Sequence, residues 1–250
     1  MKREQIASTG AEFMARKKGK GGGKRKRSQQ RAQYDELDKY PVIPPHAFAR
    51  IVRDKQTLNI LYQIIEPPMT KKEQEQREEI MDIFIRSLTA NIEEIDSDPD
   101  AYLRTALDKV IKSYGMKINK KSKSKMFYYL RRDLIGYGKM DMMMHDINVE
   151  DISLDGTNVP IFAYHRKFES VETTCVWETD AELESYVIKL AQRCGKHISV
   201  AEPLLDATLM DGSRIVMKLG REISTRGSAF CIRRFKDDPF SPCDIIAFRT

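Results

Sequence analysis

The 250-residue sequence has no glycine–lysine loop of the kind that P-loop enzymes use to hold nucleotide phosphates. Neither GxxxxGKS nor GxxxxGKT occurs in it, although the dipeptide Gly-Lys stands at 19–20, 23–24, 138–139 and 195–196. A chain without this loop cannot cradle a nucleotide in the P-loop manner. Any nucleotide phosphate that it contacts is therefore expected to be held mainly by another domain.

Cysteines and long apolar runs are scarce as well. The four cysteines, at 175, 194, 231 and 243, form no CxxC and show no paired spacing with the four histidines, so we expect no metal site. Nothing resembles a small disulfide-rich scaffold, so free thiols are expected. No apolar run approaches the roughly 18 residues of a membrane span, and the N-terminus has no apolar signal core. These absences predict a cytoplasmic protein.

Positive charge is concentrated at the N-terminus. Residues 1–33 hold eleven Lys and Arg against two Glu, which is a formal charge of +9. Because the whole chain carries +6, the remaining residues sum to −3. The segment is predicted to be a disordered basic tail. It is either a solvated tail or a docking element for anionic lipid or nucleic acid.

The region 34–123 is expected to be a variable leading region, mainly helical. Residues 34–68 hold five prolines and predict an extended connector, with one strand of a small hairpin near 57–62. Thr70 and Glu73 then have the spacing of a helix capping box. An apolar stripe follows at helical intervals, formed by Ile80, Ile83, Phe84, Leu88 and Ile92.

A second helix is predicted to begin at Pro99, with Asp98 as its cap. The lysine-rich segment 119–125 is interpreted as a solvated loop. A third helix is expected over 124–146, interrupted near Gly136. Its methionines fit core packing better than a binding surface; they are Met140 and Met142–Met144.

From Asp146 onward the pattern changes to strands and turns. Strands are predicted near 150–156 and 160–171, followed by a helix over 180–194 that Asp180 caps. A hairpin over 203–220 is predicted to turn at Asp211-Gly212, and a final strand to span 228–235. The fold class is therefore α+β, with a mostly antiparallel sheet and packed helices.

Arginines recur among the tight turns of this last part, at 214, 221, 226, 233 and 234. The guanidinium fork matches phosphate oxygens and stays protonated, so such arginines can bind phosphate. Each could instead be a surface arginine paired with Glu202, Asp206 or Glu222. By the period of a strand, Arg233 and Arg234 point to opposite faces and cannot both serve one site.

Two histidines, His165 and His197, are weak candidates for chemistry. No Ser, Cys or Asp lies at a triad-like spacing from either, so a structural role is favoured for both.

Four strings carry a resemblance to a known family: FYYLRRDLIGYGKMD, VEDISLDGTNVPIFAYHRKF, LAQRCGKHISVAEPLLDATLMDGSRI and RGSAFCIRRFKDDPFSP. They closely resemble the N-terminal region of archaeal type II/type IV secretion ATPases, the family that includes the motors of archaeal pili and archaella. The match is continuous over about 125–250. It implies that 124–240 is the N-terminal domain and that 241–250 begins a linker to a RecA-like catalytic domain.

The resemblance implies a hexameric motor that hydrolyses ATP with Mg²⁺ at the cytoplasmic face of the membrane. Its expected partners are the catalytic domain, further copies of itself and a polytopic membrane platform protein. The positions that match phosphate-contacting arginines of the family are Arg214 and Arg226, with Arg233 and Arg234 ranked second. Since the Walker motifs would follow Thr250, this chain alone is expected to be inactive, as a fragment or a truncated gene product.

Two other functions are alternatives to the hypothesis of a secretion-motor domain. One is a basic-tailed nucleic-acid-binding protein, which the net charge of −3 outside the tail disfavours. The other is an adaptor that docks on the motor without contacting nucleotide.

Overall fold

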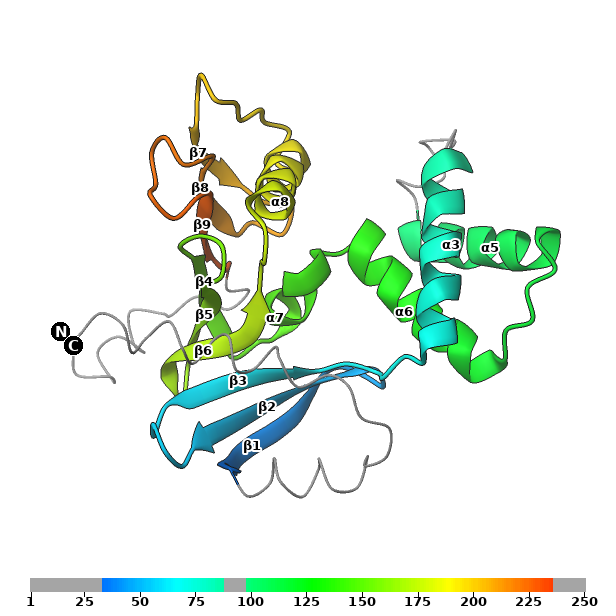
Figure 1. Cartoon of the computed structure of the whole chain (residues 1–250), viewed down its shortest axis with the longest axis horizontal. Helices are drawn as coiled ribbons and strands as arrows, with labels where there is room; N and C mark the ends of the chain where they lie inside the picture. The colour runs from blue at the N-terminus through cyan, green and yellow to red at the C-terminus, as the bar shows by residue number, and fades with distance from the viewer. Residues whose placement is uncertain (1–32, 88–97, 236–250) are drawn as a thin grey trace, which may run out of the picture.

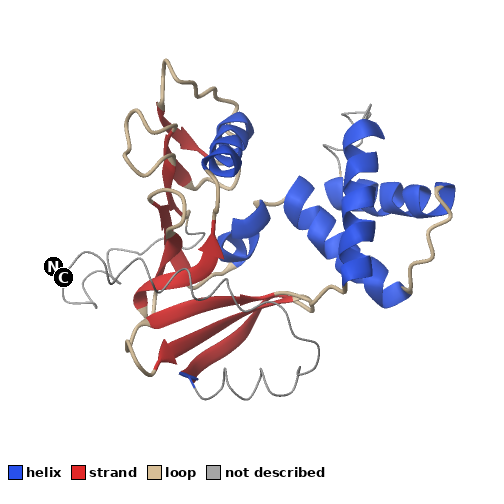
Figure 2. Ribbon diagram, viewed as in Figure 1, coloured by secondary structure: helices blue, strands red, loops and turns tan. Residues whose placement is uncertain are grey.

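Nine strands join into one continuous sheet in the computed structural model, which describes residues 33–87 and 98–235 (Figure 1). The strands lie in the order β1-β2-β3-β6-β5-β4-β9-β8-β7, and all neighbours are antiparallel except β3 and β6. This confirms the α+β class (Figure 2). The strands are β1 (Tyr34–Ile43), β2 (Ala47–Asp54), β3 (Ile60–Ile65), β4 (Val149–Leu154), β5 (Pro160–His165), β6 (Glu169–Val176), β7 (Leu204–Thr208), β8 (Arg214–Lys218) and β9 (Ala229–Arg233).

The first three strands form an antiparallel meander where an extended connector was expected, so that part of the interpretation was wrong. The expected hairpin strand near 57–62 overlaps β3, which pairs antiparallel with β2. Over the first five residues of β2, buried and half-buried positions alternate, which fits a strand with one face in the core. The turn from β2 to β3 is held by Asp54, whose Oδ1 accepts hydrogen bonds from the backbone N–H groups of Gln56 and Thr57. The prolines lie at the ends of the strands, except Pro41 in the edge strand β1, where a missing N–H costs little.

Three helices pack on one another beside the sheet: α3 (Lys71–Ser87), α5 (Pro99–Ser113) and α6 (Lys120–Leu134) (Figure 1). They enclose a small core of their own, made of Ile80, Phe84, Leu103, Leu107, Met126 and Leu130. Asp98 caps α5 as predicted. The lysine-rich segment is not a loop, because Asn119 caps α6 and the lysines occupy its first two turns.

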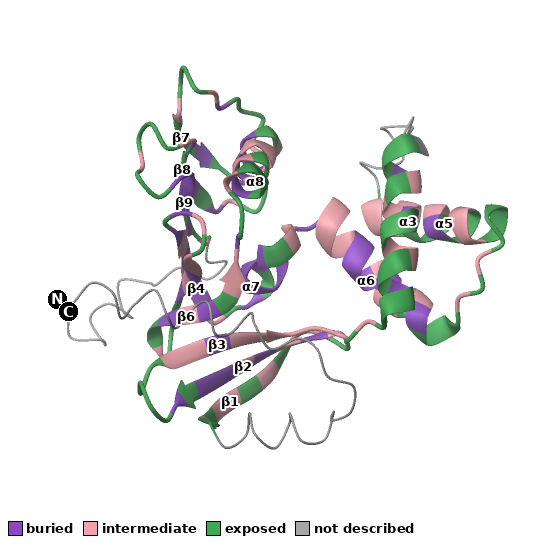
Figure 3. Ribbon diagram, in the orientation of Figure 1, coloured by how far each residue is buried: buried purple, intermediate pink, exposed green. Residues whose placement is uncertain are grey.

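The main core lies between the sheet and two shorter helices, α7 (Asp141–His145) and α8 (Asp180–Arg193), with the 3₁₀ turn η1 (Gly138–Met140) before α7. Met140 and Met142–Met144 are buried there, which confirms their core role (Figure 3). Trp177 is buried against the rings of Tyr186 and Phe230.

Of two details predicted for the last part of the chain, one is confirmed and one is wrong. The hairpin of β7 and β8 turns at Asp211-Gly212 as expected. The cap of α8 is Thr179 rather than Asp180, because the Thr179 hydroxyl accepts the hydrogen bond from the Glu182 N–H.

Some expectations lie outside the described residues: most of the basic tail, Leu88, Ile92 and the linker at 241–250. The domain boundaries stay a prediction. Among the helices of 33–87 and 98–235, none has the length and apolar character needed to cross a bilayer.

The capping box of α3 offers a test of how this helix begins. Thr70 Oγ accepts from Glu73 N, and Glu73 Oε2 accepts from Thr70 N at 2.7 Å, which confirms the box. Glu73 Oε1 also accepts from the Ser122 hydroxyl on α6 at 2.6 Å. These hydrogen bonds lower the pKa of Glu73 from 4.5 to about 2, and the bond from Ser122 has the largest effect.

Glu73→Gln is expected to lower the free energy of unfolding by about 1–2 kcal/mol at neutral pH. Because the folded pKa is the lower one, the stabilisation is present above 4.5 and is lost as the pH falls toward about 2. The difference between wild type and variant should shrink over that range in urea unfolding curves. Glu75→Gln, an exposed change on the same helix, is the control. Equal effects of both changes would contradict this account.

Candidate functional site

Two of the candidate arginines, Arg214 and Arg233, face each other across neighbouring strands. Arg214 on β8 is the register partner of Arg233 on β9. The buried residues of these strands, among them Ile215 and Ile232, point to the core, so the arginines point away from it. Their side chains are 72% and 79% exposed. The alternation of two strands thus places two arginine residues opposite each other on the solvent face of the sheet, with each guanidinium directed to a carboxylate on the other neighbouring strand.

Each of these arginines has a carboxylate beside it. Arg233 Nε donates to Asp151 Oδ1 at 3.0 Å, and Arg214 Nη2 lies 3.4 Å from Asp206 Oδ2. Like charges directly opposite on a sheet repel, so the carboxylates offset the repulsion between the guanidinium groups. Exposed pairs of this kind contribute little energy and exchange readily with other anions. Asp206 is one of the partners that the sequence suggested.

Arg226 lies at the other end of these strands, in the loop between β8 and β9. The length of β8 separates this end from Arg214, about 13 Å at 3.3 Å per residue. The Arg226 carbonyl accepts from Thr157 N at 3.2 Å, and a Cβ on Gly156 would lie 2.2 Å from that oxygen. The Arg226 backbone is therefore fixed, while its side chain is exposed.

Near Arg226, Asp180 joins the same loop to the start of α8. Its carboxylate accepts from the Thr157 hydroxyl at 2.6 Å and from Arg221 Nε at 2.7 Å. These contacts lower the pKa of Asp180, and the hydrogen bond from Thr157 has the largest effect. Arg221 is thus paired with Asp180 at the end of the hairpin opposite to Arg214 and Arg233.

Arg234 has a different environment from its neighbour Arg233, as the strand period predicted. Its Nη1 donates to the main-chain carbonyls of Val149, at 2.9 Å, and of Asp146. Burial lowers the pKa of its guanidinium. Its Nε is buried with no hydrogen-bond partner among the described residues. Arg234 therefore holds β9 to the start of β4 and is not open to a ligand.

The buried carboxylate of Asp146 is the centre of a polar cluster. Its Oδ2 accepts from the hydroxyl groups of Tyr40 on β1 and Tyr62 on β3, each at 2.7 Å. The pKa of both phenols is raised well above the ordinary value. Burial is the main cause, and the neighbouring Asp146 carboxylate adds to it. The cluster is therefore a set of protonated donors around one carboxylate.

His165 completes this cluster as a structural residue. Its Nε2 lies 3.0 Å from the Tyr40 hydroxyl, and its Nδ1 accepts from Lys167 N at 3.1 Å. Because Tyr40 donates to Asp146, its oxygen accepts from His165, which assigns the proton to Nε2. Burial lowers the pKa of His165, which favours this neutral form. His197 is exposed.

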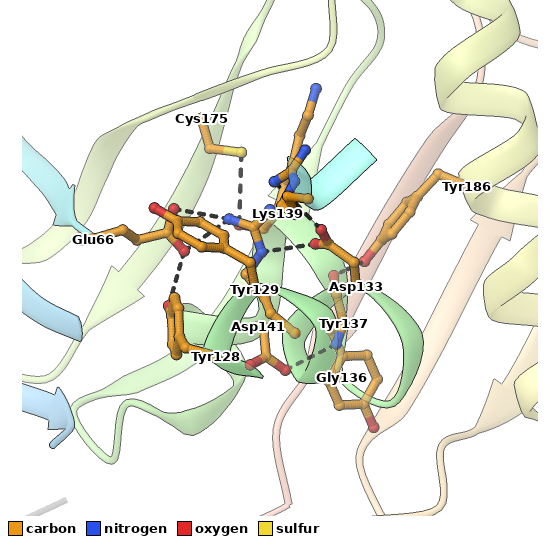
Figure 4. Close-up of polar contacts among 12 residues, drawn as sticks. Glu66, Tyr128, Tyr129, Asp133, Gly136, Tyr137, Lys139, Asp141, Cys175 and Tyr186 are labelled. Atoms are coloured by element: carbon orange, nitrogen blue, oxygen red, sulfur yellow. Dashed lines mark hydrogen bonds and ion pairs between the residues drawn. The ribbon is translucent and has the colours of Figure 1, made fainter. Parts of the chain in front are cut away.

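A second polar network joins the sheet to the three-helix group (Figure 4). Glu66, just after β3, accepts from the Tyr128 hydroxyl and from Arg132 Nη1, each at 2.8 Å. Arg132 Nε also donates to Asp133 at 2.8 Å. Burial opposes the charged form of Arg132, but Asp133 and Glu66 outweigh it and raise the pKa of the guanidinium. This network holds α6 against the end of the sheet.

The same region holds the turn after α6. Asp141 accepts from Tyr137 N at 2.8 Å, and the Tyr186 hydroxyl donates to the Tyr137 carbonyl at 2.7 Å (Figure 4). A Cβ on Gly136 would lie 2.2 Å from Asp141 Oδ1, so the position requires glycine. Within 33–87 and 98–235 no group of His, Cys, Asp and Glu could hold a metal ion.

The arginine pair is exposed to a ligand, whereas the Asp146 cluster and the Glu66 network are not. Two guanidinium groups on one open sheet face can bind an anion with several oxygens, such as a phosphate, by displacing Asp151 and Asp206. The Asp146 cluster and the Glu66 network have their donors and acceptors satisfied internally and hold the fold.

Comparison with known proteins gives archaeal relatives. No protein-family model matches the chain. It is 40% identical over 164 residues to the uncharacterized protein MJ1288 of Methanocaldococcus jannaschii, covering 65% of each chain. It is 31% identical to the uncharacterized protein MJ0900 of the same organism, covering 85% of this chain and 38% of that protein. The chain thus spans less than two thirds of the length of these relatives.

Among solved structures, the chain matches the VirB11 ATPase from the Brucella suis type IV secretion system in complex with sulphate. The TM-score is 0.36 and the identity 16%, over 49% of this chain and 35% of that one. A TM-score of this size does not establish a shared fold.

The two kinds of arginine predict different effects on stability. Arg234→Met is expected to lower the free energy of unfolding by about 1–3 kcal/mol, because it removes the side-chain donor to the Val149 carbonyl and one of the two donors to the Asp146 carbonyl. Arg214→Met and Arg233→Met should leave the free energy of unfolding nearly unchanged, since both side chains are exposed. Urea unfolding of the three variants measures this. Similar losses in all three would show that Arg214 and Arg233 are structural residues.

Proposed function

We propose that this chain is the N-terminal part of an ATP-hydrolysing motor of the secretion and pilus-assembly class. In this proposal Arg214 and Arg233 contact the phosphates of a nucleotide that a separate RecA-like domain binds with Mg²⁺. The observation that supports it best is that two exposed arginine residues are register partners on the solvent side of the sheet. The continuous sequence resemblance over about 125–250 supplies the class of motor.

The chemistry suited to such a pair is charge stabilisation. Phosphoryl transfer builds negative charge on the transferred oxygens, and a positioned arginine stabilises that charge. The guanidinium stays protonated at any physiological pH, so the pair needs no base or acid nearby. The sequence has no P-loop, so the proposal assigns nucleotide binding and hydrolysis to the catalytic domain.

The remaining parts of the proposal follow from the class of motor. The motor is a hexamer at the cytoplasmic face of the membrane, and its partners are a polytopic platform protein and neighbouring copies. Arg226 is retained as a separate phosphate contact, because it lies at the opposite end of the hairpin from Arg214. The described residues themselves contain no helix that could span a membrane.

Titration of the whole chain with sodium tripolyphosphate tests the arginine pair. The readout is NMR, because the shifts of β8 and β9 amides report this face separately from the basic tail. We expect weak saturable binding, with shifts centred on Arg214 and Arg233, that Arg214→Ala/Arg233→Ala weakens about fivefold or more.

The matched control is Arg53→Ala, which removes an exposed strand arginine from the meander. It should leave the shifts at β8 and β9 unchanged. If tripolyphosphate moves only tail signals, or if Arg53→Ala weakens binding at β8 and β9 as much as the double variant does, the pair is not a phosphate site.

A further inference from the structure

A groove of about 400 Å³ lies where the meander meets the first turns of α6. One wall is formed by Pro45, His46 and Phe48 at the start of β2, and another by residues 65–68 after β3. Lys121, Ser124 and Lys125 of α6 form the third side; their spacing of three and four places them on one helix face. Its volume is near the lower end of the range for ligand sites.

The walls of this groove are apolar and held in place. Phe48 and Ile65 are register partners on β2 and β3, so their side chains lie side by side. The Tyr129 hydroxyl donates to the Pro67 carbonyl and Lys125 Nζ to the Pro68 carbonyl, each at 2.8 Å. His46 Nε2 lies 3.1 Å from the Ser124 hydroxyl, which links the β2 wall to α6. A partner would therefore meet a preformed surface.

The charge beside the groove is positive. Five lysines fall within nine residues, at 117, 120, 121, 123 and 125. Lys123 pairs with Asp108 and Lys125 with Glu73. Lys117, Lys120 and Lys121 are exposed, and the first turn of α6 has no acidic residue to offset them.

The one carboxylate in the groove, Glu66, is already bound. Arg132 and Tyr128 donate to it, so its charge is compensated within the fold. The net field that a partner meets in this groove is therefore positive.

We propose that this groove binds an acidic segment of a partner protein, which packs an apolar side chain against Phe48 and Ile65 while its carboxylates contact Lys121. Charge complementarity and the apolar side chains of Phe48 and Ile65 support a peptide with both carboxylates and an apolar side chain over anionic lipid headgroups, which match the lysines alone. The site is independent of the arginine pair and of the motor assignment.

Fluorescence anisotropy of the whole chain with a labelled peptide of repeated Glu-Glu-Phe tests this site. We expect Lys121→Glu to weaken binding about fivefold or more at about 150 mM salt, where exposed charges act over roughly 8 Å. Lys120→Glu makes the same charge change on the next helix position, outside the groove lining, and should weaken binding less than about twofold. Lys26→Glu controls for the basic tail. Circular dichroism checks that the variants fold, and Lys121→Gln replaces Lys121→Glu if that variant does not.

A second part of the experiment tests the apolar side chains of Phe48 and Ile65. A peptide of repeated Glu-Glu-Gly should bind more weakly than the phenylalanine peptide, and Phe48→Ser should abolish that preference. Equal losses for Lys121→Glu, Lys120→Glu and Lys26→Glu would overturn the proposal, as would equal binding of both peptides. Binding to phosphatidylserine vesicles that depends on Lys121, without binding of either peptide, would show a membrane contact instead.

Discussion

The buried carboxylate of Asp146 is the contact on which the rest of the structure depends. Between the meander and the second half of the sheet, the strand pairing consists of Leu61–Glu172 and Tyr62–Thr173 alone. Asp146 adds to this short junction by accepting from Tyr40 of β1 and Tyr62 of β3, while its own carbonyl accepts from Arg234 at the end of β9. A buried carboxylate with several donors is costly to leave unpaired. One residue therefore fixes the meander, the start of β4 and the end of β9 relative to one another.

This arrangement separates the structural charges from those that a ligand can reach. Arg132 is paired with carboxylates of the fold, and Arg234 directs its Nη1 to two main-chain carbonyls. Arg214 and Arg233 have only exposed carboxylates as partners, and these are contacts that an incoming anion can replace. The strand period causes the difference between Arg233 and Arg234, which are adjacent in sequence. The groove between the meander and α6 is a second open surface, and the meander stands at the opposite end of the strand order from β8 and β9.

Local signals in the sequence predicted local structure well, and contacts between distant residues were not predictable from it. The capping box of Thr70 and Glu73, the Asp98 cap, the buried methionines and the turn at Asp211-Gly212 each depend on a few neighbouring residues. The meander was missed because its prolines outweighed a weak alternation. Tyr40 and Asp146 are 106 residues apart, and no local pattern marks their contact. The sequence indicated which arginines were candidates, but strand register decides that Arg214 faces Arg233 rather than Arg226.

The central claim is that these arginines serve a nucleotide held by another domain, so the measurement that tests it most directly is to sequence the coding region beyond Thr250 and its neighbouring genes. The account predicts a GxxxxGKS or GxxxxGKT loop, either in the same reading frame or in an adjacent gene whose product binds this chain. A stop codon directly after Thr250, with no such gene beside it, would contradict the account, because the arginine pair would then have no nucleotide to contact.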